Sequence, residues 1–183
     1  MLQDNQLLYG AIDMHVHFAP DPSRERKDSA LGLARQAAEA GMRGVVLKAH
    51  HYCSTPVCST VNEIDIGAEL FGSLVLSRSL GGLNPRAVEV AAALGTRVLW
   101  MPTTDSVVDA ARRGEEGVRL TGEDSTLLPE VGRILEIVKK HDMLLCTGHI
   151  GPEEVFALVR RAVGMGIATV VTHPLTTVAG SPL

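Results

Sequence analysis

Four histidines stand where parallel α/β proteins place their ligand sites. His15 and His17 form an HxH pair near the end of a predicted strand, and His149 and His173 each end a later strand. Because ligand sites in such folds lie at the carboxyl ends of strands, we expect these three strand ends to meet. Neutral imidazole is the commonest zinc ligand, so the four side chains predict a metal site.

The segment 11–18 reads AIDMHVHF and alternates two kinds of residue. Since alternate residues of a strand point to opposite faces, one face carries the polar set and the other the large apolar set. The polar set is Ala11, Asp13, His15 and His17, and the apolar set is Ile12, Met14, Val16 and Phe18. We expect the polar set to point into a barrel, with both imidazoles meeting one metal ion. Asp13 is predicted to orient a ligand imidazole. The alternative is a chance histidine pair at a strand end.

Two further side chains, Lys48 and His50, end the second predicted strand and share a face. They are candidates for substrate binding, with Lys48 contacting a carboxylate or phosphate. A polar strand end that simply meets solvent is an equally good reading. His51 should point away from His50. His141 follows two lysines at a helix end, where the helix dipole favours a cation, so we interpret it as structural.

Asp105, which follows the fourth predicted strand, has two readings. It is either a ligand or base of the site, or a residue that caps the next loop, and the loop role is favoured. The segment Arg112–Ser125 is rich in glycine and charge. This composition predicts a surface loop, and a lid over the site is the more specific alternative.

Short β-branched or leucine-rich runs alternate with helical patterns along the whole chain. The predicted strands are 11–18, 44–50, 74–79, 97–103, 143–149 and 167–173. The predicted helices are 29–40, 61–71, 85–94, 127–141 and 152–163. Glycines follow several of these helices, as helix C-termini favour. Six alternations of roughly 25–35 residues predict parallel strands joined by right-handed crossovers.

This pattern predicts an α/β fold of the (β/α)8 TIM-barrel type with about six of the eight βα units. A closed barrel typically needs about 250 residues, and this chain has 183. We therefore expect a single domain over residues 1–183 that lacks its C-terminal part, with an open sheet as the alternative. Residues 179–183 show no clear helix or strand. Exposed first and sixth strands favour oligomerisation or poor solubility.

The composition excludes several classes of partner. Hydrophobic residues make up 45% of the chain and aromatic residues 3%, which favours aliphatic strands under alanine-rich helices. The net charge is −4 and no long basic run occurs, so nucleic acid is not expected. No membrane span or signal peptide is visible, and the three cysteines are taken as free thiols, so a cytoplasmic protein is predicted.

The motifs DMHVH at 13–17, TGHI at 147–150 and VTHP at 171–174 resemble the amidohydrolase superfamily of TIM-barrel metal hydrolases. The resemblance covers nearly the whole chain and is closest to a largely uncharacterised branch. It implies that His15 and His17 of strand one, His149 of strand five and His173 of strand six bind metal. It also implies that His173 can touch substrate. The candidate catalytic residues are therefore His173, through that contact, and Asp13, through the ligand ring that it would orient.

Two departures from the family pattern shape the expected chemistry. Residues 98–104 lack the carboxylated lysine or glutamate that supports a second metal, so one divalent ion, most simply zinc, is expected. The aspartate that usually follows strand eight as general base is absent from the chain. The resemblance implies hydrolysis of a small-molecule amide, ester or lactone by a metal-activated water. The alternatives are a non-catalytic metal-binding or assembly module and a phosphoesterase of the histidinol-phosphatase type.

Overall fold

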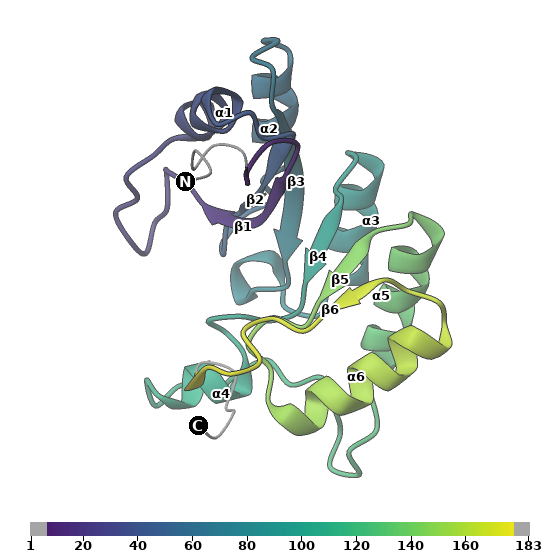
Figure 1. Cartoon of the computed structure of the whole chain (residues 1–183). Helices are drawn as coiled ribbons and strands as arrows, with labels where there is room; N and C mark the ends of the chain where they lie inside the picture. Colours follow the sequence, from purple (N-terminus) through teal and green to yellow (C-terminus); the bar gives the residue numbers. More distant parts are fainter. Residues whose placement is uncertain (1–6, 178–183) are drawn as a thin grey trace.

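The central element is a sheet of six parallel strands that curls into a half-barrel (Figure 1). The computed structural model describes residues 7–177. The strands lie side by side in chain order, and they are β1 (Ile12–His17), β2 (Gly44–Lys48), β3 (Glu69–Val75), β4 (Val98–Trp100), β5 (Leu144–Cys146) and β6 (Thr169–Val170). The carboxyl ends of all six strands therefore lie at the same edge of the half-barrel, as the sequence predicts.

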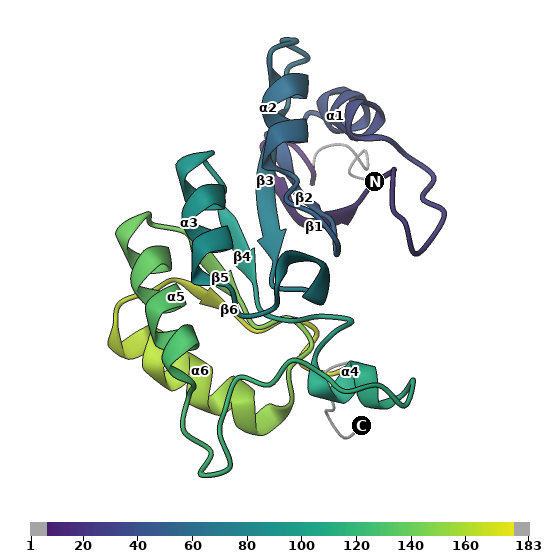
Figure 2. The same cartoon turned by 180° about the vertical axis from the view of Figure 1, so that it is seen from behind.

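The helices pack on the convex side of this sheet (Figure 2). They are α1 (Ala30–Glu39), α2 (Thr55–Asn62), α3 (Pro85–Ala93), α4 (Val107–Ala111), α5 (Pro129–Lys140) and α6 (Pro152–Gly164), with a short 3₁₀ turn, η2, at Arg78–Leu80. The short helix α4 is the exception, because it lies near the carboxyl ends of the strands. Within residues 7–177, no helix is both long and apolar enough to cross a membrane.

The sheet is apolar on both faces, as parallel strands usually are. In β2, Val45 and Leu47 pack against α1 and α2, whereas Val46 points to the concave face. A small concave cluster joins Val46 to Val75, Val98, Trp100 and Cys146. Since side chains alternate along a strand, Lys48 shares the concave face with Val46. The concave face therefore changes from aliphatic to polar toward the carboxyl ends.

The predicted helix 61–71 and strand 74–79 are wrong in position. The structure has α2 at Thr55–Asn62, and β3 begins at Glu69. Gly72, read from the sequence as a helix stop, lies inside β3, where a Cβ would overlap the side chain of Thr55. The Asn62 side chain bonds both backbone groups of Leu70 and holds the connection short. Glycine here serves close packing of a helix on a strand, which local sequence does not distinguish from a helix end.

The predicted faces of the first strand are only half right. The register of β1 against β2 shifts between Asp13 and Val16, so that two residues of β1 oppose one of β2. Such an irregularity reverses the facing of the residues before it. Val16 and Phe18 pack toward the helices as expected, but Ile12 packs with the concave cluster and Asp13 is exposed.

Candidate functional site

Five histidine rings form a closed circuit at the carboxyl edge of the half-barrel. His15 and His17 lie on β1, and their ring centroids are 5.3 Å apart. His50, after β2, stacks on His17 at 4.6 Å and lies 6.4 Å from His149, which follows β5. His173, after β6, lies 5.5 Å from His149 and 5.0 Å from His15. The structure thus brings together all four predicted ligands and the predicted substrate-binding His50.

Hydrogen bonds fix the orientation of two of these rings. Nδ1 of His17 donates to the backbone carbonyl of Lys48 at 3.1 Å, because a carbonyl only accepts. Nδ1 of His149 lies 3.1 Å from the Asp109 carboxylate and donates to it in the same way. Both bonds place the ring proton on Nδ1, so Nε2 of each neutral ring carries an unprotonated lone pair. This is the arrangement that orients metal-binding histidines in other proteins.

Burial keeps these imidazoles neutral. It lowers the pKa of His15 from 6.5 to about 3 and that of His50 to about 2, with Lys48 acting in the same direction. It lowers the pKa of His17 and of His149 to about 4, although Asp109 partly opposes the shift at His149. The pKa of His173 is lowered as well, by burial and then by Lys48. Neutral imidazole is the form that binds metal and accepts a proton.

The amino group of Lys48 lies within this circuit. Its Nζ is 3.2 Å from Nε2 of His15 and 4.2 Å from the centroid of the Trp100 ring. Burial lowers the pKa of Lys48 from 10.5 to about 7. As the side chains stand, no three His, Cys, Asp or Glu residues within 7–177 are arranged to hold a metal ion. The imidazole nitrogens are nevertheless the donor type that a divalent ion such as zinc prefers.

The loops after β5 and β6 place His149 and His173 by unusual backbone conformations. Gly148 has a φ of +66°, and a Cβ there would overlap the carbonyl oxygens of Met101 and Pro102. This close approach lets the backbone N–H of His149 donate to Pro102 at 2.9 Å. His173 itself has a φ of +48°, which non-glycine residues seldom adopt. Backbone strain of this kind gathers at functional sites.

Asp13 does not take its predicted position. Its carboxylate is exposed and accepts a hydrogen bond from the backbone N–H of His15 at 3.0 Å. Among the described residues it bonds no imidazole ring, because the register shift in β1 turns it away from the cluster. Asp13 therefore supports the backbone of His15 and does not orient a ring.

Three other sequence readings are resolved by position. His141 is exposed at the C-terminus of α5, on the helical layer and away from the histidine circuit, as its structural reading predicts. Asp105 accepts from the backbone N–H of Arg78 at 2.8 Å, which matches the loop role. His51 bonds Ser23 at 2.5 Å, and its ring lies 6.3 Å from that of His50, so it adjoins the circuit at one member without closing it.

Asp109 and Trp100 belong to the site and were not predicted. Asp109 lies on α4, a helix that the sequence reading treated as part of the loop region. The available signal was the sequence SVVD at 106–109, in which Ser106 caps α4 and accepts from the Asp109 backbone N–H at 3.2 Å. The Ser106 hydroxyl also donates to the carbonyl of His149 at 2.8 Å, so one serine ties α4 to the site.

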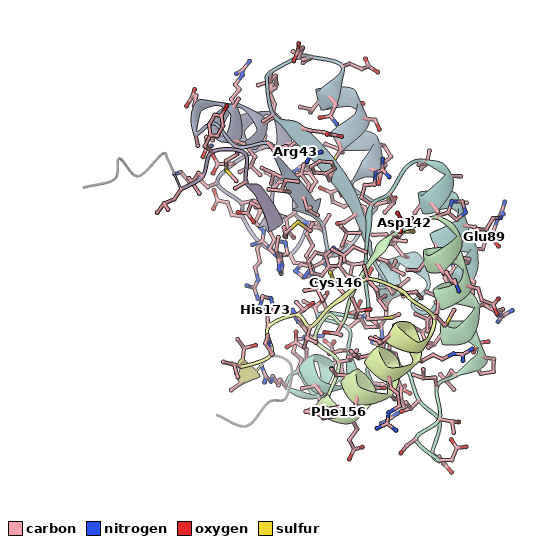
Figure 3. The ribbon with its side chains drawn as sticks, turned by 45° about the vertical axis from the view of Figure 1, so that its right-hand side comes forward. Arg43, Glu89, Asp142, Cys146, Phe156 and His173 are labelled. Carbon is pink, nitrogen blue, oxygen red and sulfur yellow. The ribbon has the colours of Figure 1, made fainter. Side chains whose placement is uncertain are left out.

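A small pocket of about 150 Å³ opens beside the circuit. His15, His173, Trp100 and Cys146 are part of its lining, and Figure 3 shows His173 at the open side of the sheet with Cys146 deeper inside. Two larger hollows, of about 500 and 560 Å³, contain no histidine. One surrounds Arg43, at the opposite end of β2 from the site, and the other lies between α3 and α5. The small pocket is the one that adjoins the candidate chemistry.

The fold and the site define a parallel α/β half-barrel with a histidine cluster at the carboxyl edge of its strands. The chain belongs to a family of unknown function, DUF6282, whose model matches residues 10–183. The comparison with curated proteins finds no match.

Proposed function

We propose that this protein is a metal-dependent hydrolase that acts on a small-molecule amide, ester or lactone. The observation that carries the proposal is the closed circuit of five neutral imidazoles at the carboxyl ends of parallel strands. A divalent ion, most simply one zinc, suits a donor set composed of imidazole. His15, His17 and His149 would hold the ion, and His173 would either join them or contact the substrate.

The six βα units are proposed to correspond to the first six of a (β/α)8 barrel. The sequential order of the strands, their parallel direction and the curl of the sheet support this assignment. The strand-end positions of the histidines support the resemblance to amidohydrolases that the motifs suggest. In barrels of this kind the active site is built at the carboxyl ends of the strands.

The ion, when bound, supplies Lewis acidity: it lowers the pKa of a water toward about 7 and polarises the scissile carbonyl. The chain's own residues do the rest. Asp109 and the Lys48 carbonyl hold the His149 and His17 rings with Nε2 directed away from their partners. His173 borders the pocket and is neutral, so a ring nitrogen can take a proton and return it to the leaving group.

Metal analysis followed by a substrate screen tests the proposal. Protein prepared without chelator should contain about one divalent ion per chain, and it should hydrolyse at least one lactone, amide or ester. Chelation should abolish the activity, and zinc should restore it. Protein that neither contains metal nor takes it up would rule out this function. Metal uptake without hydrolysis of any substrate would favour the non-catalytic metal-binding module.

Asp109→Asn should weaken zinc binding by about tenfold or more, the lower range for loss of a partner that orients a ligand. The amide is a weaker acceptor for His149 Nδ1–H than the carboxylate, so the ring loses its fixed orientation. Competition with a chromophoric chelator measures the affinity. Asp105→Asn is the matched control, since Asp105 bonds the backbone of Arg78 and no imidazole. Equal losses in both variants would remove Asp109 from the site.

A further inference from the structure

The most unusual polar group in the site is the Lys48 side chain, which is 1% exposed. It lies on the concave face of β2, where a hydrophobic residue would be the ordinary choice for a position so deeply buried. Its Nζ has His15 Nε2 as its hydrogen-bond partner, together with the face of the Trp100 ring. Taking a lysine out of water costs free energy unless an anion compensates it.

The acids near the site are already paired with other groups. The Asp109 carboxylate bonds His149, and Asp21 forms an ion pair with Arg26 at 2.7 Å. Over residues 7–177, Lys48 forms no ion pair with a carboxylate. The described part of the chain therefore buries this amine without a carboxylate counterion.

A second buried donor lies next to it. Trp100 is 3% exposed, and its Nε1–H has no hydrogen-bond acceptor in the part of the chain that the structure describes. The Lys48 amine sits over the ring of this same residue. A buried donor without an acceptor is uncommon and costs about 1–3 kcal/mol in general. The Lys48 amine and the Trp100 indole N–H are thus two adjacent buried donors, one without an anionic partner and the other without an acceptor among the described residues.

The pocket beside these donors has a distinct shape and chemistry. Its volume is about 150 Å³, and Trp100 and His15, the two neighbours of the Lys48 amine, are among the residues that line it. Much of the remaining lining is apolar and includes Met14, Leu144 and Val170. A small molecule with a short apolar body and one anionic end matches this combination.

We propose that the substrate of this site carries a carboxylate, and that Lys48 binds it with the indole N–H of Trp100 as a second donor. The inference rests on the proposed function, because it assigns this pocket to the same active site. A single buried amine and an apolar wall suit a monoanionic carboxylate. A phosphate dianion calls for more donors, typically several backbone N–H groups or an arginine.

Trp100 provides the readout, because it is the one tryptophan of the chain. Butyrate, its neutral amide butyramide and inorganic phosphate are titrated into the full chain, both zinc-loaded and metal-free, while Trp100 emission and the melting temperature are followed. Butyrate should give a saturable change in emission and raise the melting temperature. Butyramide should require about tenfold higher concentrations or more, since hydrogen bonds to charged groups are the stronger ones. Phosphate should also bind more weakly than butyrate, because its dianion calls for more donors than one amine and one indole N–H.

Lys48→Met removes the amine with little change in side-chain length, and Lys139→Met on the exposed end of α5 is the matched control. We expect butyrate affinity to fall about tenfold or more in the first variant and to stay unchanged in the second. Equal binding of butyrate by Lys48→Met and the wild type overturns the proposal. If Lys48→Met fails to fold, the comparison of acid with amide in the wild type decides alone.

The outcomes also separate this inference from the proposed hydrolase. Lys48-dependent butyrate binding in a protein that takes up no zinc would support the carboxylate site and reject the metal-dependent function. Zinc uptake with equal responses to butyrate and butyramide would reject the carboxylate site and leave the hydrolase standing. A preference for phosphate over butyrate would overturn the assignment to a carboxylate.

Discussion

Replacing His17 with alanine is expected to weaken zinc binding by at least about 10–100-fold, the range for loss of a group that merely orients a ligand. His17 connects two other rings of the circuit, since its ring stacks on His50 and its centroid lies 5.3 Å from that of His15. Its Nδ1–H is held by the Lys48 carbonyl, so Nε2 is the free donor atom. Alanine removes that donor and breaks the closed set of rings. Competition with a chromophoric chelator gives the affinity of each variant.

The control for this experiment is His141→Ala, which should bind zinc as well as the wild type does. His141 is exposed at the end of α5 and touches no ring of the circuit. Asp13→Asn should have a small effect, because Asp13 supports only the backbone of His15. If His17→Ala and His141→Ala bind zinc equally well, the histidine circuit is not a metal site and the proposed hydrolase is wrong.

Metal-free protein is expected to lose stability steeply as the pH falls from about 6.5 to about 4. An unfolded chain protonates its histidines near pH 6.5, whereas the folded chain holds the pKa of His17 and His149 at about 4, and that of His15 at about 3. Between these values the unfolded state binds more protons, so stability rises with pH and is lost as pH falls. Each such histidine contributes up to about 1.4 kcal/mol per pH unit.

Urea unfolding of chelator-treated protein at several pH values measures this slope. His149→Gln should reduce the slope by up to about 1.4 kcal/mol per pH unit, because one titrating group is removed. Lys48 acts in the same direction at higher pH. Its pKa is about 7 in the folded protein and 10.5 in the unfolded chain, so the free energy of unfolding should rise further with pH between these two values. A flat stability profile from pH 4 to 6.5 would show that the imidazoles are not buried as described.

The sequence by itself determined the α/β class of the fold and the edge of the sheet on which the candidate histidines lie. Strand and helix patterns in alternation predict parallel strands, because parallel neighbours need a crossover between them. Parallel strands bring their carboxyl ends to one edge, so the sequence placed histidines 15, 17, 149 and 173 on that edge, and the curl of the sheet then brought β1 close to β6. The chemistry of the edge follows from residue type and from position along each strand, which are both local properties.

Only the tertiary structure decided how the donors are held and what surrounds them. The register shift in β1 turned Ile12 inward and Asp13 outward, because pairing with β2 overrides the simple alternation. Asp109 reaches His149 from a helix forty residues earlier in the chain, and no local pattern links the two. The burial of Lys48 against Trp100 likewise depends on two strands that are separated by a third, β3. Contacts between distant segments depend on how the half-barrel curls, and a pattern read along the chain carries no information about that curvature.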